Sequence, residues 1–480
     1  MVICPTSTEV EKFLTLDERV AVQQERGGIK FVNKKTPMFG PAVTADGRSA
    51  VISHHGLWRS LAESLEEKGY TVSITDVRKN LIGEPKVVDA MIGLRPWQKP
   101  WMLRALYSGE SGLIGAPTRY GKSYGMTSLC RAFPKAKTVV TAPGIDLCQQ
   151  IYEHFKTTLG KLRDIRAVYT GSRNRMQGPD ITVCSMDSLE KMDDDTELLI
   201  VDEPHAVVSD TRIPGVTRFA KARKYGFGAT LKGRSDRRDR LIEGLIGPVI
   251  SNVTYRDAVE QGAISPMKVV ILEIPFSKDT VPGNPNRDTV YKRLLTESSR
   301  TAGLVRKLMF EVIPQDWQTM AFIRNEKQAE FYMQHAMPET GTIAMAKRLA
   351  KKERDAVTAG IASGEILRVL ASKIYVQGVT FPDLRVVVNL EGGGANTGTI
   401  QKPGRLLQTR LGKNYGVMFD FKFVCRDKQL ESRQKPPYGC IEWESVARIA
   451  AYREIGYDVE FVKDAERARE IVLAAYEPGK

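Results

Sequence analysis

A Gly-Lys-Ser sequence stands between a short apolar run and a helical stretch just past the first quarter of the chain. The apolar run is Gly112–Gly115, and the next eight residues read Ala-Pro-Thr-Arg-Tyr-Gly-Lys-Ser, ending at Ser123. This order predicts a strand, a loop and a helix whose N-terminal backbone N–H groups can face a phosphate chain. Lys122 would offset phosphate charge, and the Ser123 hydroxyl would hold Mg²⁺. A chance Gly-Lys-Ser turn is the alternative, and the strand-loop-helix context weakens it.

Two carboxylates follow another apolar run. Asp202 and Glu203 come directly after Leu198–Val201 and precede a Pro-His pair. In an open parallel sheet, ligands bind at the carboxyl ends of the strands, so both side chains are expected beside the phosphate loop. Asp202 would then hold the Mg²⁺ that Ser123 also contacts, and Glu203 would act on water as a general base. Alone, such a pair is usually a solvated turn; with the loop, it predicts an ATP-hydrolysing site that uses ATP and Mg²⁺.

Apolar runs predict two α/β units in tandem. From residue 95 onward, short β-branched runs alternate with helical stretches, which is typical of parallel strands joined by crossover helices. The expected strands are 112–115, 138–141, 167–169, 181–184 and 198–201 in the first unit, and 319–323, 368–371, 386–390 and 416–420 in the second. Between the two series, residues 275–290 are rich in Pro, Asn and Asp and are predicted to be a linker or a long surface loop.

The first 90 residues differ in charge from the rest. They hold 12 Lys plus Arg against 12 Asp plus Glu, whereas residues 91–480 hold 59 against 45 and so carry the whole net charge of +14. Residues 50–74 predict a strand, a helix and a strand at 70–74, as in a small α/β module. We expect an accessory domain at 1–90, α/β domains at 91–256 and 257–466, and a C-terminal tail at 467–480.

Composition narrows the class of protein. Of the 480 residues, 42% are hydrophobic and 27% charged, as in globular proteins. No apolar run approaches the ~18 to 20 residues of a membrane span, and the N-terminus lacks the pattern of a signal peptide, so a cytoplasmic protein is expected, in the host if phage-encoded. The six cysteines lack metal-site spacing. A positive net charge favours a polyanionic partner, and basic residues cluster at 218–240.

From residue 94 to about residue 460 the chain resembles the superfamily two helicases and translocases, whose fold is two tandem RecA-like domains with parallel sheets and helices on both faces. The segment ending at Gln98 resembles the element whose glutamine reads adenine. Residues 141–144 and 185–189 are similar to the two motifs that face the nucleic-acid backbone, and 228–230 to the motif that links hydrolysis to strand movement. In the second half, 319–325, 369–384 and 401–405 resemble the later motifs.

The resemblance implies roles for the residues that match these motifs. Catalysis is assigned to Lys122, Asp202, Glu203, Gln401 and Arg405, with Arg405 as the arginine finger. Nucleotide binding is assigned to Gln98, Ala116, Thr118, Gly121, Lys122, Ser123, Gly378 and Arg410, and metal binding to Ser123 and Asp202. DNA contact is assigned to Pro143, Gly144, Ser185, Arg223, Lys224, Arg234 and Arg237, the last four from the basic cluster. A solvated arginine in a Gly-Arg turn is the alternative for Arg405.

Some positions depart from the family pattern. Gln408 stands where a second arginine is usual, so Arg410 substitutes for it or the site works with one finger. Thr380 stands where an aspartate often contacts ribose. Arg119 and Tyr120 replace smaller residues in the phosphate loop and are expected to narrow its entrance.

Within the superfamily, three motifs most resemble those of phage DNA helicases of the UvsW type: Leu-Arg-Pro-Trp-Gln at 94–98, Asp-Glu-Pro-His at 202–205 and Pro-Gly-Arg at 403–405. That resemblance implies a DNA helicase or translocase that remodels branched or forked DNA by unwinding, branch migration and fork regression. The sequence does not give the oligomeric state, and a monomer is favoured. Three alternatives stay open: an RNA helicase, the motor subunit of a restriction or defence complex, and a nucleic-acid-binding scaffold whose ATPase has decayed.

Overall fold

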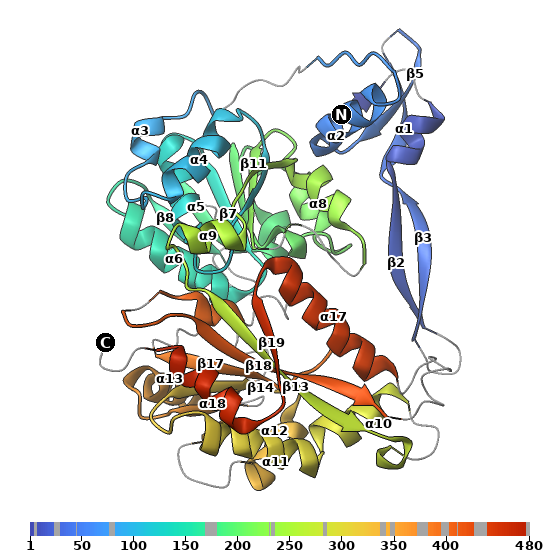
Figure 1. Ribbon diagram of the computed structural model, residues 1–480. Helices are drawn as coiled ribbons and strands as arrows, with labels where there is room; N and C mark the ends of the chain where they lie inside the picture. The colour runs from blue at the N-terminus through green and yellow to red at the C-terminus, as the bar shows by residue number, and fades with distance from the viewer. Residues whose placement is uncertain are drawn as a thin grey trace. The chain divides into compact units, whose positions relative to one another are not determined.

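The structure of the protein is a computed structural model in which the path of the chain is described for most residues. The described residues are 1–3, 7–23, 29–44, 46–75, 82–168, 180–229, 231, 236–281, 286–336, 342–345, 351–371, 383–394, 403–409, 411–426 and 439–476. The chain divides into two compact units, Met1–Thr254 and Tyr255–Lys480 (Figure 1). This division falls close to the boundary predicted after residue 256, while the limits at residues 90 and 466 stay predictions.

A seven-stranded parallel sheet forms the centre of the first unit. Its order is β12-β6-β11-β10-β7-β9-β8. The strands are β6 Gly112–Gly115, β7 Thr138–Ala142, β8 Ile165–Val168, β9 Ile181–Ser185, β10 Leu198–Asp202, β11 Arg223–Gly228 and β12 Val249–Asn252. Every residue of β6, β7, β9 and β10 is buried, because helices cover parallel sheets and their strands read as continuous apolar runs. All five predicted strands are present; β11 and β12 were not predicted.

Four helices of the first unit follow strands of this sheet or precede them. They are α4 Gln98–Tyr107, α5 Lys122–Ala132, α6 Ile145–Leu159 and α8 Asp239–Ile246.

No helix within the described ranges is both long and apolar enough to cross a membrane.

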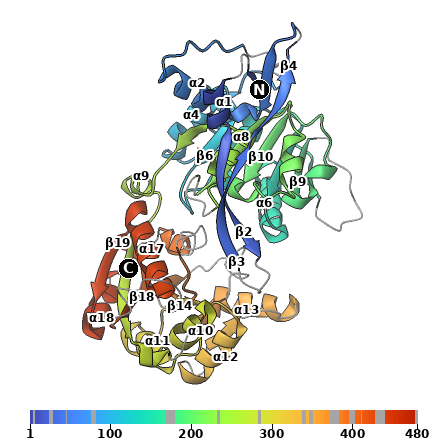
Figure 2. The same cartoon turned by 90° about the vertical axis from the view of Figure 1, so that its right-hand side faces the viewer.

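The N-terminal residues form small antiparallel sheets together with helices α1 and α2, which agrees with the small α/β module that was predicted. Three strands pair in the order β1-β5-β4, and β2 pairs with β3 as a long twisted ribbon (Figure 2). The elements are β1 Val2–Ile3, α1 Thr8–Phe13, β2 Thr15–Gln23, β3 Ile29–Pro37, β4 Phe39–Val43, β5 Ser49–Ser53 and α2 Trp58–Glu66. The predicted strand at 50–53 and the helix after it are confirmed. The strand predicted at 70–74 is wrong, because Tyr70 and Ile74 are exposed and no described strand lies there.

The second unit contains another seven-stranded parallel sheet, of order β15-β16-β14-β17-β18-β13-β19. The strands are β13 Met267–Phe276, β14 Gln318–Phe322, β15 Thr342–Met345, β16 Arg368–Ala371, β17 Leu384–Asn389, β18 Gly416–Cys425 and β19 Asp458–Val462. All four predicted strands are present. Of the two alternatives for residues 275–290, the interdomain linker is wrong, because β13, which includes residues 275 and 276, already pairs with β18 inside this unit.

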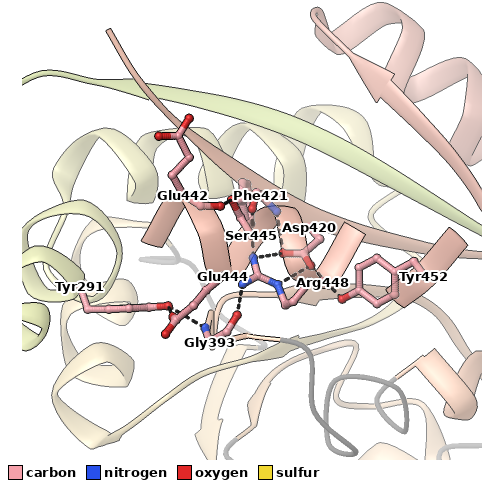
Figure 3. A network of polar contacts seen from close by, with 9 residues as sticks. All are labelled: Tyr291, Gly393, Asp420, Phe421, Glu442, Glu444, Ser445, Arg448 and Tyr452. Carbon is pink, nitrogen blue, oxygen red and sulfur yellow. Dashed lines mark hydrogen bonds and ion pairs between the residues drawn. The ribbon is translucent and has the colours of Figure 1, made fainter. Parts of the chain in front are cut away.

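A buried ion pair joins β18 to helix α17 (Gly439–Ile455) in the second unit (Figure 3). Arg448 donates two hydrogen bonds of 3.0 Å to the carboxylate of Asp420, and Tyr452 donates one of 2.8 Å. Arg448 also bonds the carbonyl of Gly393, in the segment that follows β17. Because Asp420 and Arg448 are each 1% exposed, both charges depend on this network for compensation.

Candidate nucleotide site

The phosphate loop connects β6 to α5 as predicted. It ends at Gly121, which has a left-handed backbone (φ 100°) and precedes the first residue of the helix, Lys122. A Cβ at Gly121 would lie 2.2 Å from Nε2 of Gln98, so only glycine fits there. At the other end of the loop, the N–H of Ala116 donates a hydrogen bond of 3.1 Å to the carbonyl of Gly228 on β11. The loop is therefore fixed at both ends.

Buried side chains of α4 hydrogen-bond to backbone carbonyls of the phosphate loop and of the strand before it. Gln98 is 1% exposed; its Nε2 donates to the carbonyl of Tyr120 (2.7 Å), and its Oε1 accepts from the N–H of Arg95 (2.9 Å). Trp101 donates from Nε1 to the carbonyl of Gly115 (3.0 Å). Gln98 is thus engaged with the loop, and contact with adenine would require its amide to exchange partners. Sequence reasoning missed Trp101, which carries no motif signal.

Tyr120 does not narrow the loop entrance. Its side chain points into the protein, where its hydroxyl donates to the carbonyl of Trp97 (2.9 Å) and its ring meets Trp101 edge to face at 5.4 Å. Tyr120 is 2% exposed. Arg119, by contrast, is exposed and has a left-handed backbone (φ 70°), a conformation that costs a non-glycine residue about 1 kcal/mol or more.

Asp202 and Glu203 lie where β10 ends, at the same carboxyl edge of the sheet. Asp202 is 7% exposed, and its Oδ1 has no hydrogen-bond partner among the described residues. Burial and the neighbouring carboxylate of Glu203 raise the pKa of Asp202, while Lys122 opposes the rise. The positive charge of Lys122 acts on both carboxylates, so the structure brings these three predicted residues together.

Glu203 is held in its own unusual conformation. Its backbone is left-handed (φ 54°), and its Oε2 lies 3.3 Å from Nδ1 of His205. Burial alone would raise the pKa of Glu203, but the contact with His205 and the charge of Lys122 bring that pKa below its usual value. A carboxylate that stays charged is in the form that can accept a proton from water, and its lowered pKa makes it a weaker base than one tuned to neutral pH. His205 was part of the motif, but the sequence assigned it no role.

The residues present fit a bound Mg²⁺. The unpartnered Oδ1 of Asp202 is a buried oxygen of the kind that Mg²⁺ prefers, and Mg²⁺ typically takes one or two protein oxygens and fills its other positions with phosphate and water. Ser123 begins the same helix as Lys122 and is half-buried. Ser123 and Asp202 would hold the cation, which would give Oδ1 of Asp202 a partner.

The predicted residues of the second half are only partly described. Gln401, Gly378 and Arg410 lie outside the described residues. Arg405 lies in the 3₁₀ helix η7 (Pro403–Leu407) of the second unit, and its side chain is outside the described part. Their roles at the γ-phosphate stay predictions.

Two of the predicted DNA contacts are wrong for the structure as it stands, because their side chains are buried. Lys224 is 2% exposed and donates from Nζ to the carbonyls of Val216 (3.1 Å) and Leu245 (3.3 Å). Burial lowers the pKa of Lys224 to about 8. Ser185 is 2% exposed, and its hydroxyl lies 2.9 Å from that of Ser188.

The remaining predicted DNA contacts are distributed over the first unit. Pro143 and Gly144 follow β7 at the carboxyl edge and are half-buried. Arg223 lies over the ring of Phe133 at 5.5 Å. Arg237 is ion-paired with Asp17 of the N-terminal ribbon at 3.7 Å. Arg234 lies outside the described residues.

Comparison with known proteins gives consistent similarities. The family described as type III restriction enzyme, res subunit, matches residues 91–233. The DNA 3'-5' translocase XPB2 of Sulfurisphaera tokodaii is 24% identical over 393 residues, covering 70% of this chain and 86% of that protein. The DNA 3'-5' helicase XPB of Kineococcus radiotolerans is 22% identical over 412 residues, covering 82% of this chain and 70% of that protein.

Solved structures share the fold. The DNA-bound type ISP restriction-modification enzyme LlaBIII aligns with a TM-score of 0.55 at 14% identity, over 81% of this chain and 33% of its own. T4 UvsW aligns over 95% of both chains at 15% identity, but its TM-score of 0.39 is too low to support an inference. Both sheets of this chain therefore have the architecture of tandem RecA-like domains.

Proposed function

We propose that this chain, which is an ATP-dependent DNA helicase or translocase of superfamily two, remodels branched DNA by unwinding, branch migration and fork regression. The observation that supports hydrolysis is the placement of Lys122, Asp202 and Glu203 at one carboxyl edge of the first sheet. The resemblance to helicases of the UvsW type supports the finer choice of branched DNA.

Hydrolysis would divide its tasks among these residues. Lys122 and the backbone N–H groups at the start of α5 would bind the β- and γ-phosphates. Asp202 and Ser123 would hold Mg²⁺, which when bound neutralises phosphate charge. Glu203, kept charged by His205, would take a proton from the attacking water. Gln401 and Arg405 would complete the site by stabilising the transition state.

DNA would be held through its phosphates. A translocase must bind the backbone without reading the bases, and a net charge of +14 favours such contacts. The residues that support this proposal are Pro143 and Gly144, which are half-buried and follow β7, and exposed arginines of the first unit.

An ATPase assay with single-stranded, duplex, forked and four-way DNA, and with RNA, tests this proposal. We expect the greatest stimulation with forked and four-way DNA, and turnover near background in Lys122→Ala and Glu203→Gln with folding preserved. Lys156→Ala, on the exposed side of α6, is a matched loss of one lysine that should leave turnover unchanged. Greater stimulation by RNA would make the chain an RNA helicase. Unchanged rates in both site variants would refute the assigned site.

A restriction motor is the second candidate, because the family matching residues 91–233 is a restriction subunit. Such a motor would translocate on unbranched duplex as efficiently as on forked DNA. Displacement of a triplex-forming strand from linear duplex would favour this candidate over the branched-DNA helicase.

A further inference from the structure

Arg212 joins two segments of the first unit that have different predicted tasks. Its Nε and Nη2 donate to the two carboxylate oxygens of Asp187 at 2.7 and 3.3 Å, and its Nη1 donates to the carbonyl of Ala206 at 3.2 Å. Asp187 belongs to η2 (Met186–Lys191), which directly follows β9. Ala206 ends η3 (Pro204–Ala206), which begins immediately after Glu203. The guanidinium of Arg212 therefore contacts both η3, which follows Glu203, and η2, which overlaps the segment that the resemblance predicts to face DNA.

Close packing joins η2 to the helix that follows Arg212. Arg212 precedes helix α7 (Ile213–Thr217), which packs on η2. A Cβ at Gly215 would lie 3.0 Å from Cβ of Leu189, so the two segments approach closely. After α7, Arg218 donates to the carbonyl of Glu190 at 2.5 Å. A displacement of η3 would therefore be transmitted through Arg212 to a unit made of α7 and η2.

The geometry of the link requires arginine. A guanidinium is planar and can donate to a carboxylate with two N–H groups while a third reaches a carbonyl, whereas a lysine ammonium acts as a point charge. The side chain of Arg212 is 22% exposed and that of Asp187 is 52% exposed. An ion pair with a partner this exposed adds little to the free energy of unfolding. The contact is therefore better explained as one that orients η2 and η3 relative to each other.

We propose that Arg212 is a positioning residue that couples the hydrolysis segment at Glu203–Ala206 to the segment at residues 185–189. The inference rests on the proposed function and on the resemblance of residues 185–189 to a motif that faces the nucleic-acid backbone; in that segment Ser185 is buried and Asp187 is exposed. DNA bound at η2 would bias the position of η3 and so of Glu203, and the nucleotide state would act on η2 in return, because coupling between two sites is reciprocal. The link is a contiguous set of contacts, and a measured coupling is what establishes it.

The test compares ATPase rates with and without DNA in Arg212→Ala and Arg212→Lys. We expect both variants to keep a basal rate within about twofold of the unchanged protein. Both should lose about tenfold of the DNA stimulation, since neither alanine nor lysine has the planar set of N–H donors that bonds the carboxylate and the carbonyl together. Arg166→Ala is the matched control, because Arg166 also pairs with an aspartate, Asp164, at 3.2 Å on the surface of the same unit. This control should keep full stimulation. Thermal unfolding establishes that each variant is folded.

A double-mutant cycle separates positioning from a general loss of structure. Asp187→Ala combined with Arg212→Ala should lower DNA stimulation no further than Arg212→Ala alone, because both changes break one link. Equal losses of basal and stimulated rates, or unaltered stimulation in both Arg212 variants, would overturn the coupling alone. No stimulation of the unchanged protein by any DNA would overturn the proposed function and the coupling with it.

Discussion

The side-chain amide of Gln98 and the backbone carbonyl of Tyr120 are joined by a hydrogen bond of 2.7 Å beneath the phosphate loop. This contact fixes the residue before Gly121, whose left-handed backbone turns the loop into α5. The same amide also accepts a hydrogen bond from Arg95. Gln98 consequently sets the shape of the loop from inside the protein.

Gln98→Ala should weaken the use of every nucleoside triphosphate alike. The change leaves the carbonyl of Tyr120 and the N–H of Arg95 without their partners, which costs about 1–3 kcal/mol. We expect kcat/KM to fall about tenfold for both ATP and GTP. A loss confined to ATP would show instead that Gln98 reads adenine. Steady-state ATPase and GTPase assays measure the difference.

Gly121→Ala should abolish nucleotide binding, and a second glycine isolates the reason. Gly109 also has positive φ (65°), but a Cβ there would meet nothing within 4 Å, whereas at Gly121 it would collide with Gln98. Gly109→Ala should therefore cost only the backbone strain, about 1 kcal/mol. Titration with a fluorescent ATP analogue should show binding intact in Gly109→Ala and lost in Gly121→Ala. Equal losses of nucleotide binding in the two variants would mean that backbone strain, rather than a collision with Gln98, causes the loss.

Lys224→Met should remove a specific dependence of stability on pH. Burial lowers the pKa of Lys224 to about 8 from an ordinary value of 10.5. Between these values the unfolded chain binds more protons than the folded one, so the free energy of unfolding rises with pH. The rise amounts to about 3 kcal/mol and is complete near pH 10.5. Urea unfolding at several pH values should show this rise in the unchanged protein and not in the variant.

The same variant tests the correction to the DNA contacts. Because Lys224 bonds two carbonyls inside the first unit, Lys224→Met should leave the dependence of DNA affinity on salt unchanged. A salt slope reduced by about one would show that Lys224 contacts a phosphate after all.

Glu18→Gln should destabilise the first unit more than Asp17→Asn. Glu18 accepts from Nε of Arg238 at 2.7 Å with only 4% of its side chain exposed, whereas Asp17 and Arg237 form an exposed pair at 3.7 Å. Loss of the buried carboxylate should cost about 2 kcal/mol, since Arg238 keeps its contact with Asp210. Loss of the exposed one should cost less than about 1 kcal/mol. Thermal unfolding of the two variants gives the order, and a reversed order would contradict the assigned burial.

The fold was predictable where strands are buried on both faces. Runs such as Leu198–Val201 are continuously apolar because helices cover the sheet. Strand β11 escaped prediction because Arg223 and Lys224 begin it, and basic residues indicate a surface. Strand β2 carries Asp17 and Glu18, whose partners lie more than 200 residues away in sequence. The apolar run of β13 carries the same signal as β10 and was overlooked.

The site was predictable where one motif implies one geometry. Lys122, Asp202 and Glu203 follow from spacing and from the carboxyl-edge rule. The partners of Gln98 and Arg212 did not follow, because both hydrogen-bond to backbone carbonyls, which no residue type marks. Lys224 shows the opposite error, in which a charged residue near a motif is assigned to a ligand although its charge is satisfied internally.

Strand β11 receives a hydrogen bond from each half of the nucleotide site. Its last residue, Gly228, accepts from Ala116 at 3.1 Å, and the residue before it accepts from Glu203 at 2.8 Å. Two adjacent carbonyl groups of β11 thus hold both the phosphate loop and the turn that carries Glu203. A displacement of either segment would therefore act on the same end of β11, so the two halves of the nucleotide site share one mechanical support.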